Sequence, residues 1–289
     1  RTEHMFFGEG RIPIVQRMIL ATNEVDRRKA LDELRPLQRD DFYQVFKKMD
    51  GQPVTIRLID PPLHEFLPKR EDLMVDIARM ESTNKYSERL EASRTVLRRL
   101  EQLTEFNPML GHRGVRLAIT YPEITEMQVG AIMEAACQLA REGRKVVPEI
   151  MIPLVSDVRE LQYQKRIVER VASEIQASFG TKVKYLFGTM IEVPRAVLTA
   201  DQIASESQFF SFGTNDLTQL GYGFSRDDAG KFLQIYQEKK ILERDPFQSI
   251  DKVGIGELVS LGVERGRRTN PTLKMGICGE HGGDAASVF

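Results

Sequence analysis

The sequence predicts an α/β fold of the (β/α)8 TIM-type barrel class. Apolar runs of strand length alternate with stretches of helical length, the pattern of parallel strands joined by helical crossovers. Several runs end in a charged or reactive residue, as in VTIRLID (54–60), LFGTMIEV (186–193) and LKMGICGE (273–280). In a parallel barrel the chemistry gathers at the carboxyl ends of the strands. The length of 289 residues fits one barrel better than two small domains, so we predict a single domain, 1–289.

Six strands are expected from these apolar runs, at 54–60, 115–120, 146–154, 184–193, 208–212 and 273–278. Helices are expected between them at 125–142 and 156–180, and three shorter helices precede the first strand, at 11–23, 26–35 and 39–49. Eight strands need two more, and their natural places are just before Arg1 and just after Phe289. We therefore expect a barrel truncated at both terminal strands, a fragment of a larger multidomain enzyme.

Two insertions interrupt this pattern. The first, 61–113, contains a charged helix at 89–103. Such an insertion at the rim of a barrel commonly covers the site, whereas a charged helix face is also typical of a surface exposed to water. The second insertion, about 222–268, carries a turn followed by a helix start, GFSRDDAGKF, to which we assign no chemistry.

Composition excludes several function classes. The formal net charge of −1 gives no overall field that would attract nucleic acid or an anionic membrane. The two cysteines are too few for a disulfide framework or a four-cysteine zinc site, so we expect the cytoplasm or an organelle with a reducing interior. We find neither an apolar run of the roughly 18 residues that a membrane helix needs nor a signal peptide.

Two carboxylates follow predicted strands. Glu192 ends the run MIEV, and Asp216 follows the strand in FFSFGTNDLTQ (209–219). Carboxylates from two strand ends of one rim suit Mg²⁺, which takes oxygen ligands and usually only one or two of them from protein carboxylates. The alternative is that each carboxylate caps a helix or pairs with an arginine, such as Arg195 beside Glu192.

Three arginines are placed where the rim would present them to an anion: Arg1, Arg57 and Arg113. Arg57 lies within an apolar strand, where an unpaired cation is costly, so it must face either Asp60 or an anionic ligand. Arg113 lies in a Pro- and Gly-containing loop, and either it or Arg116 is the inward residue.

Cys278 ends the run LKMGIC and is followed by the polar, glycine-rich turn GEHGGD. These neighbours make it a candidate reactive thiol, although an isolated cysteine at a strand end can equally be inert. Cys137, on an amphipathic helix, is interpreted as a small core residue.

Six motifs spread over the whole chain resemble the C-terminal phosphoenolpyruvate- and pyruvate-binding domain of the pyruvate, phosphate dikinase family. They are RTEHMFF (1–7), VTIRLIDPPLHEF (54–66), NPMLGHRGVRL (107–117), GTMIEVPRA (188–196), FFSFGTNDLTQ (209–219) and GICGEHGGD (276–284). Phosphoenolpyruvate synthase and enzyme I of the sugar phosphotransferase system share similar motifs. The His4 after RTE and the EHGGD after Cys278 are more similar to the dikinases.

The resemblance implies a role for each candidate residue. Arg1, Arg57 and Arg113 would hold the phosphate and carboxylate of phosphoenolpyruvate, Asn215 would contact the substrate, and the backbone of Thr214 to Asp216 would help to hold its carboxylate. Glu192 and Asp216 would bind Mg²⁺, and Cys278 would protonate the enolate carbon.

The implied function is Mg²⁺-dependent interconversion of pyruvate and phosphoenolpyruvate, with overall conversion of ATP, phosphate and pyruvate to AMP, diphosphate and phosphoenolpyruvate. The phosphohistidine and nucleotide-binding domains that precede this barrel in the family are not in the chain, so the implied partners are those domains of the full-length protein. We also expect a homodimer, and neither nucleic acid nor membrane as a partner. The alternatives are a phosphoenolpyruvate synthase-like enzyme, a Mg²⁺-dependent carbon–carbon lyase of the same superfamily, and a non-enzymatic oligomerisation module.

Overall fold

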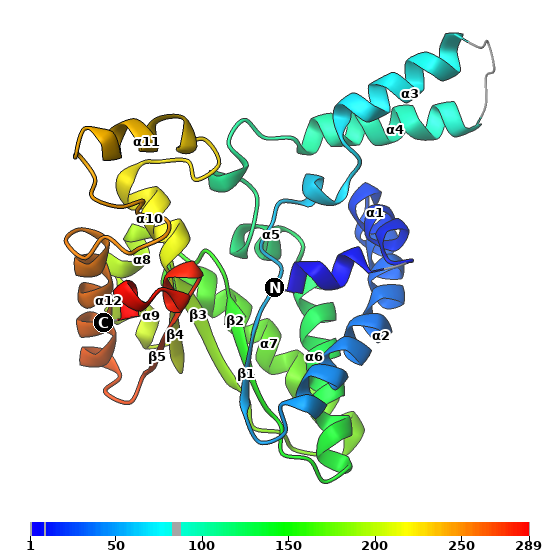
Figure 1. Ribbon diagram of the computed structural model, residues 1–289. Coiled ribbons are helices and arrows are strands. Elements are labelled where there is room, and N and C mark those ends of the chain that lie inside the picture. The colour runs from blue at the N-terminus through cyan, green and yellow to red at the C-terminus, as the bar shows by residue number, and fades with distance from the viewer. Residues whose placement is uncertain (1, 9, 83–87, 289) are drawn as a thin grey trace. The chain divides into compact units, whose positions relative to one another are not determined.

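The computed structural model describes residues 2–8, 10–82 and 88–288, which form two compact units (Figure 1). Unit 1 comprises 1–52, 59–146 and 170–183, and unit 2 comprises 53–58, 147–169 and 184–289. The organisation as a single domain stays a prediction.

Unit 2 is built on a parallel sheet whose strands follow one another in chain order, β1 to β5 (Figure 1). Parallel neighbours require a crossover between successive strands, and parallel strands covered on both faces read as continuous apolar runs. The strands are β1 (Pro53–Arg57), β2 (Val147–Ile152), β3 (Leu186–Ile191), β4 (Phe209–Gly213) and β5 (Lys274–Cys278).

The sheet is strongly curved. Glu149 on β2 is buried, and its carboxylate accepts hydrogen bonds from Thr55 on β1 at 2.6 Å and from Lys274 on β5 at 2.5 Å. In a flat sheet β2 and β5, with two strands between them, would lie about 14 Å apart. Their side chains meet because the sheet curls around this pair, as part of a barrel wall does. Closure into eight strands stays a prediction.

The residues of β4 alternate between the two faces of the sheet. Phe209 packs with Met151 and Met190 in one hydrophobic cluster, which Cys278 also contacts. On the opposite face, Phe210 and Phe212 pack against glycines of α12 so closely that an added Cβ would lie 2.9 Å and 2.8 Å from the two rings. The faces of β4 are therefore assigned, and Ser211 and Gly213 lie on the same face as Phe209.

The helices of unit 2 follow the strands and pack on one another. After β3 come α8 (Pro194–Leu198) and α9 (Ala200–Ala204), and after β4 come α10 (Thr214–Tyr222), α11 (Gly230–Glu238) and α12 (Ile255–Thr269). The 3-10 helix η4 (Glu280–Gly283) and α13 (Ala285–Val288) follow β5. The segment around α11 has a separate small hydrophobic cluster, which is formed by Ala229, Leu233 and Phe247. The helix start predicted there in GFSRDDAGKF is confirmed.

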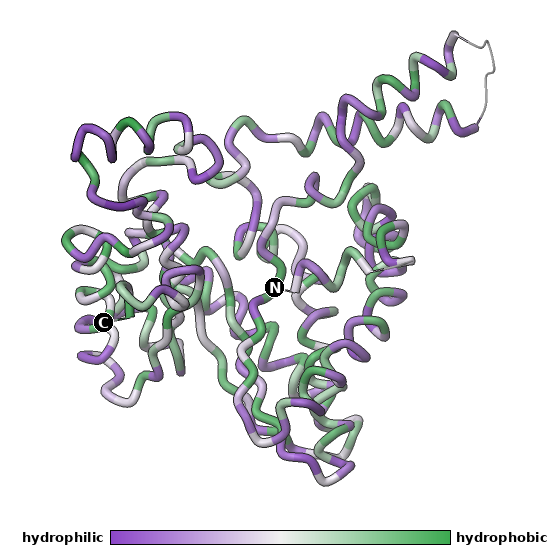
Figure 2. The backbone as a smooth tube through the Cα atoms, in the orientation of Figure 1, coloured by the Kyte–Doolittle hydropathy of each residue, from purple (hydrophilic) through white to green (hydrophobic). Residues whose placement is uncertain are grey.

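Unit 1 is helical, and its core lies between α2 (Glu24–Lys48) and α6 (Pro122–Arg141). Its other elements are η1 (Thr2–Phe7), α1 (Ile12–Leu20), η2 (Leu63–Phe66), α3 (Arg70–Ser82), α4 (Glu88–Leu103), η3 (Pro108–Leu110), α5 (Val115–Thr120) and the second half of α7 (Val158–Phe179), whose first half belongs to unit 2. Leu31 and Leu34 of α2 are buried in one cluster with Ile124 and Met127 of α6. Hydrophilic and hydrophobic residues alternate along α3 and α4 (Figure 2).

Two expectations about these elements are wrong. The strand predicted at 115–120 is helix α5, whose residues Val115, Leu117 and Ala118 are buried. A short apolar run does not distinguish a strand from a buried helical turn by its periodicity. The two helices expected at 26–35 and 39–49 are one helix, α2, which continues through Pro36. Packing against α6 stabilises α2 over its length despite the proline.

Other helices are confirmed with small shifts of their ends. The helix expected at 125–142 is α6, which begins earlier because Pro122 occupies its first turn, and ends before Gly143. The helix expected at 156–180 is α7, and the charged helix expected at 89–103 is α4; a role for it as a cover stays a prediction. Among the described residues, no helix is long and apolar enough to cross a membrane.

Candidate active site

Most of the predicted site residues lie at the carboxyl ends of the strands of unit 2. Arg57 is the last residue of β1, Glu192 directly follows β3, Thr214, Asn215 and Asp216 begin α10 immediately after β4, and Cys278 is the last residue of β5. Parallel strands bring these ends to one edge of the sheet, so residues far apart in the sequence meet there.

Glu192 is fully buried, and its position is set by the backbone on two sides. Its Oε1 accepts a 2.7 Å hydrogen bond from the backbone N–H of Leu154, a non-glycine residue with φ of 59°. Its Oε2 lies so close to Gly213 that a Cβ there would be 2.4 Å from this oxygen. A left-handed non-glycine residue costs energy and is often found where function requires a particular backbone direction. The carboxylate is therefore held in a narrow space beside the end of β4.

The first turn of α10 brings Asp216 and Asn215 to the same edge. Asp216 is half-buried, and the N-terminal turn of a helix favours negative charge. The Oδ1 of Asn215 is buried and accepts no hydrogen bond from any residue that the structure describes. A buried polar atom left without a partner is uncommon and fits a side chain that awaits a ligand.

The Cys278 thiol lies among charged groups. Burial has the largest effect and raises the pKa of the Cys278 thiol above its ordinary value. The carboxylates of Glu192 and Asp216 raise this pKa further. A hydrogen bond from Ser211 and the charge of Arg57 lower it. The effect of burial on this pKa outweighs that of Arg57. The protonated thiol, which contacts the Phe212 carbonyl oxygen at 3.5 Å, is the form that can donate a proton.

A second set of contacts holds the end of β5. His281 is fully buried, with Nδ1 2.6 Å from the Thr214 hydroxyl and Nε2 2.9 Å from the Pro246 carbonyl oxygen. The Thr214 hydroxyl is also within 3.3 Å of the Cys278 carbonyl oxygen. Gly279 has a φ of 99°, a conformation that only glycine adopts readily, which allows the chain to turn sharply after Cys278.

The donor set fits Mg²⁺. Glu192 and Asp216 come from the adjacent strands β3 and β4, and both are close enough to Cys278 to affect its pKa. In the part of the chain that the structure describes, no group of three or more His, Cys, Asp or Glu side chains could hold a metal. Two carboxylates suit an ion whose remaining ligands are substrate oxygens and waters, rather than a closed structural site.

Of the other two predicted arginines, the structure describes Arg113. Arg113 belongs to unit 1, is buried, and pairs with Asp60 through Nη2 and Oδ2 at 2.5 Å. It is thus the inward residue of its loop, because Arg116 is half-buried and donates to the Gly111 carbonyl oxygen. Asp60, the suggested partner of Arg57, takes Arg113 as a partner. Arg1 lies outside the described residues.

Arg195 and Cys137 make contacts that stabilise the fold. Arg195, the suggested partner of Glu192, pairs with Asp157 at 3.3 Å and donates to the Ser156 carbonyl oxygen. Cys137 is fully buried in α6, as expected for a core residue. Neither brings new chemistry to the strand ends.

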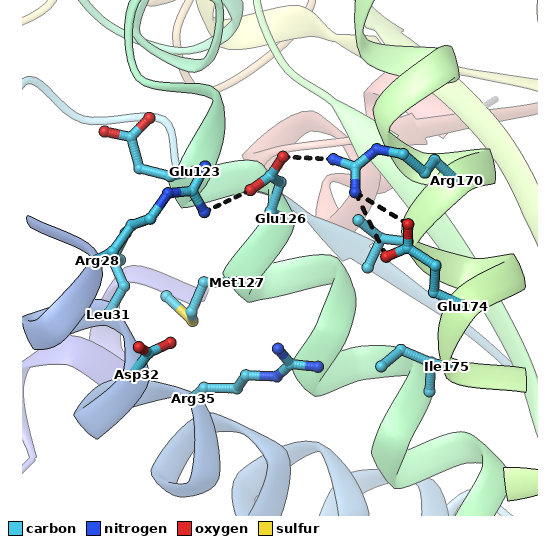
Figure 3. Close-up of a pocket in the computed structure, with 11 residues that line it drawn as sticks. Arg28, Leu31, Asp32, Arg35, Glu123, Glu126, Met127, Arg170, Glu174 and Ile175 are labelled. Carbon is cyan, nitrogen blue, oxygen red and sulfur yellow. Dashed lines mark hydrogen bonds and ion pairs between the residues drawn. The ribbon is translucent and has the colours of Figure 1, made fainter. Parts of the chain in front are cut away.

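Unit 1 contains a cavity of about 130 Å³ lined by charged side chains of α2, α6 and α7. Glu126 lies between the guanidinium groups of Arg28 and Arg170, and Arg170 also pairs with Glu174 (Figure 3). These charges satisfy one another, and none of the residues predicted for the site lines the cavity.

Comparison with known proteins shows the family of the chain. The family described as PEP-utilising enzyme, PEP-binding domain, matches residues 1–289. The chain belongs to this family. As a PEP-utilising enzyme domain, it is 56% identical over all of its 289 residues to a pyruvate, phosphate dikinase of Rhizobium meliloti (strain 1021), of which it covers 31%. It is 54% identical to pyruvate, phosphate dikinase 1, chloroplastic, of Arabidopsis thaliana, covering 29%, and 51% identical to a pyruvate, phosphate dikinase of Clostridium symbiosum, covering 32%.

The chain thus spans about a third of the length of these curated relatives. The family assignment confirms the resemblance seen in the sequence motifs. The α/β architecture with a curved parallel sheet is consistent with a PEP-binding domain.

Three contributors to the site could not be identified from the sequence. Leu154 acts through a backbone N–H, Ser211 is an ordinary strand residue that reaches Cys278, and His281 acts through Thr214. Alternation along β4 places Ser211 on the face of Gly213, which is the one sequence signal that could have suggested it. For Leu154 the sequence contains no such signal.

Proposed function

We propose that the chain is the phosphoenolpyruvate- and pyruvate-binding domain of a pyruvate, phosphate dikinase. The observation that carries this proposal is the half-buried thiol of Cys278 at a strand edge shared with Arg57, Glu192 and Asp216. An enolate that has lost its phosphoryl group needs a proton donor at its carbon and positive charge at its oxygens. The thiol of Cys278 would meet the first need, and Arg57 together with a metal ion held by the two carboxylates would meet the second.

The proposed reaction assigns one step to each residue. Phosphoenolpyruvate gives its phosphoryl group to a histidine of another domain: the P–O bond to the enol oxygen breaks and a P–N bond to the histidine forms. The electron pair of the broken bond stays on the enol oxygen, which gives the enolate of pyruvate. The enolate carbon then takes the Sγ proton of Cys278, which leaves a thiolate and pyruvate; the reverse direction returns the proton to sulfur. Arg57 binds the anionic end of the substrate, and Asn215 orients it.

Glu192 and Asp216 would hold Mg²⁺, and the ion would offset the negative charge that develops on the enolate and phosphoryl oxygens. The narrow space around Glu192 would limit how far its carboxylate can move. Arg1 and Arg113 are further proposed ligands for the phosphate and carboxylate. The donor histidine, the nucleotide-binding domain and a homodimeric assembly belong to the same proposal.

Calorimetric titration with phosphoenolpyruvate and with oxalate, an enolate-shaped dianion, tests the proposal. Binding should require Mg²⁺, and Glu192→Ala and Asp216→Ala should each weaken it by far more than they lower the melting temperature. Unchanged binding in both variants, or equal binding with and without Mg²⁺, would exclude the assignment.

Proton exchange tests Cys278 separately. If the chain exchanges the methyl protons of pyruvate with deuterium, Cys278→Ala should slow the exchange by about 10²- to 10⁴-fold, the contribution typical of a general acid or base. Binding of oxalate should survive. Exchange at the wild-type rate, followed by NMR, would show that the thiol is not the proton donor.

A further inference from the structure

The imidazole of His281 is anchored at both nitrogens. It is fully buried, and Nε2 lies 2.9 Å from the carbonyl oxygen of Pro246 in the segment between α11 and α12. A carbonyl oxygen only accepts, so Nε2 carries a hydrogen. Nδ1 then faces the hydroxyl of Thr214, at 2.6 Å.

The Thr214 hydroxyl lies between this imidazole and the strand end that carries the thiol. Thr214 follows Gly213, which pairs in register with Cys278, and its Oγ1 lies 3.3 Å from the Cys278 carbonyl oxygen. A hydroxyl has one hydrogen, so it can donate to Nδ1 or to this carbonyl but not to both at once. The shorter contact, with Nδ1, fixes where Oγ1 lies beside the Cys278 carbonyl oxygen.

The turn after Cys278 returns the chain to the same place. Gly279 has a φ of 99°, and a Cβ added there would lie 3.2 Å from Asn215 Nδ2 and 3.5 Å from Thr214 Oγ1. The turn is therefore packed against the start of α10, and His281, two residues later, reaches Thr214 from the other side. The backbone of Cys278 is therefore held by the contacts of Gly279 and Thr214, and not by its own side chain.

We propose that His281 is a positioning residue, which acts through the Thr214 hydroxyl to fix the end of β5 and so keeps the half-buried Cys278 thiol aligned. The proposal rests on the proposed function, in which this thiol donates the proton. Burial is the main reason that the thiol stays protonated, so a small displacement of the strand end that admits water would change its reactivity.

Four variants of the full chain separate a positioning role from simple packing. His281→Gln places its amide near the Nε2 position and loses the contact with Thr214, whereas His281→Asn places its amide near Nδ1 and keeps that contact. Thr214→Val removes the hydroxyl with little change of volume, and Thr214→Ser keeps it. The readout is the rate of Cys278 alkylation by iodoacetamide as a function of pH, followed by mass spectrometry of the peptide that contains it.

We expect His281→Gln and Thr214→Val to be alkylated about threefold to tenfold faster near pH 8, as when the thiol pKa falls by about half a unit to one unit. His281→Asn and Thr214→Ser should stay within about twofold of the wild-type rate, the range expected when the pKa does not move. Wild-type rates in His281→Gln and Thr214→Val would overturn the proposal. Equal acceleration in all four variants, or loss of the folded state in all four, would also overturn it, because the effect would then come from packing and not from the hydroxyl.

The test needs no substrate, so its result is independent of the proposed function. If Mg²⁺-dependent binding of phosphoenolpyruvate fails while the alkylation pattern holds, His281 positions the thiol and the assigned chemistry is wrong. If binding holds and the pattern fails, the function stands and His281 has no positioning role.

Discussion

Replacing Gly213 by alanine should disable the proposed metal site without removing any charge. Gly213 has a φ of −84° and a ψ of 80°, so alanine is not excluded by its backbone conformation. The added Cβ would lie 2.4 Å from Glu192 Oε2 and 2.7 Å from the methyl group of Met190. The effect of the substitution is therefore steric, and it falls on the carboxylate.

The size of the effect follows from these distances. Ordinary van der Waals contact begins at about 3.4 Å, so Oε2 must move away by about 1 Å. Metal–ligand distances tolerate about 0.2 Å, so the displaced oxygen no longer reaches the position of an ion held by Asp216. We expect Mg²⁺-dependent binding of oxalate to weaken at least tenfold, or about 1.4 kcal/mol. Overpacking should lower the free energy of unfolding by about 1–3 kcal/mol.

The assay is calorimetric titration of oxalate with and without Mg²⁺, on protein shown to be folded by circular dichroism. Gly276→Ala is the matched control, because Gly276 lies on the adjacent strand β5 and a Cβ there meets no atom within 4 Å. Gly276→Ala should bind as the wild type does. Folded Gly213→Ala that binds oxalate within about twofold of the wild type, a difference of about 0.4 kcal/mol, would refute the reasoning.

Three further predictions concern stability. Gly279→Ala should lower the free energy of unfolding by about 1–3 kcal/mol in urea titrations, because alanine is strained at a φ of 99°. The control Gly283→Ala, with no such φ and no neighbour within 4 Å, should lower it by less than about 1 kcal/mol. Equal losses in the two variants would contradict this prediction. Asp60→Ala should cost about 3–5 kcal/mol because it removes the carboxylate of a buried ion pair. Asp40→Ala, from an exposed pair, should cost at most about 1 kcal/mol, and a similar small loss in both variants would show that the buried pair is not important. The raised pKa of the Cys278 thiol means that its contribution to stability is fully present below the unfolded thiol pKa and is lost as the pH rises through the folded one. The stability of the wild type relative to Cys278→Ser should therefore fall as the pH rises above the ordinary thiol pKa of about 8.5, and a constant difference in urea midpoints would contradict the raised pKa.

Five of the six expected strands are confirmed because buried parallel strands are encoded locally. Each is a short apolar run bounded by turn residues, and burial on both faces makes that run continuous. Residues 115–120 have the same local pattern but form α5. These residues form a short helix that packs beside α6. The periodicity of the sequence does not predict this tertiary contact.

By itself, the sequence determined which residues stand at the strand ends, since Glu192, Asp216 and Cys278 each follow an apolar run directly. It also determined the family, because the motifs around these positions extend over the whole chain. Tertiary structure alone decided the surroundings of these residues: the Leu154 N–H on Glu192, the partner of Asp60, and the His281 and Thr214 contacts behind Cys278. The pKa of a thiol depends on burial by distant segments, so the sequence could suggest a reactive cysteine but not that it would be held protonated.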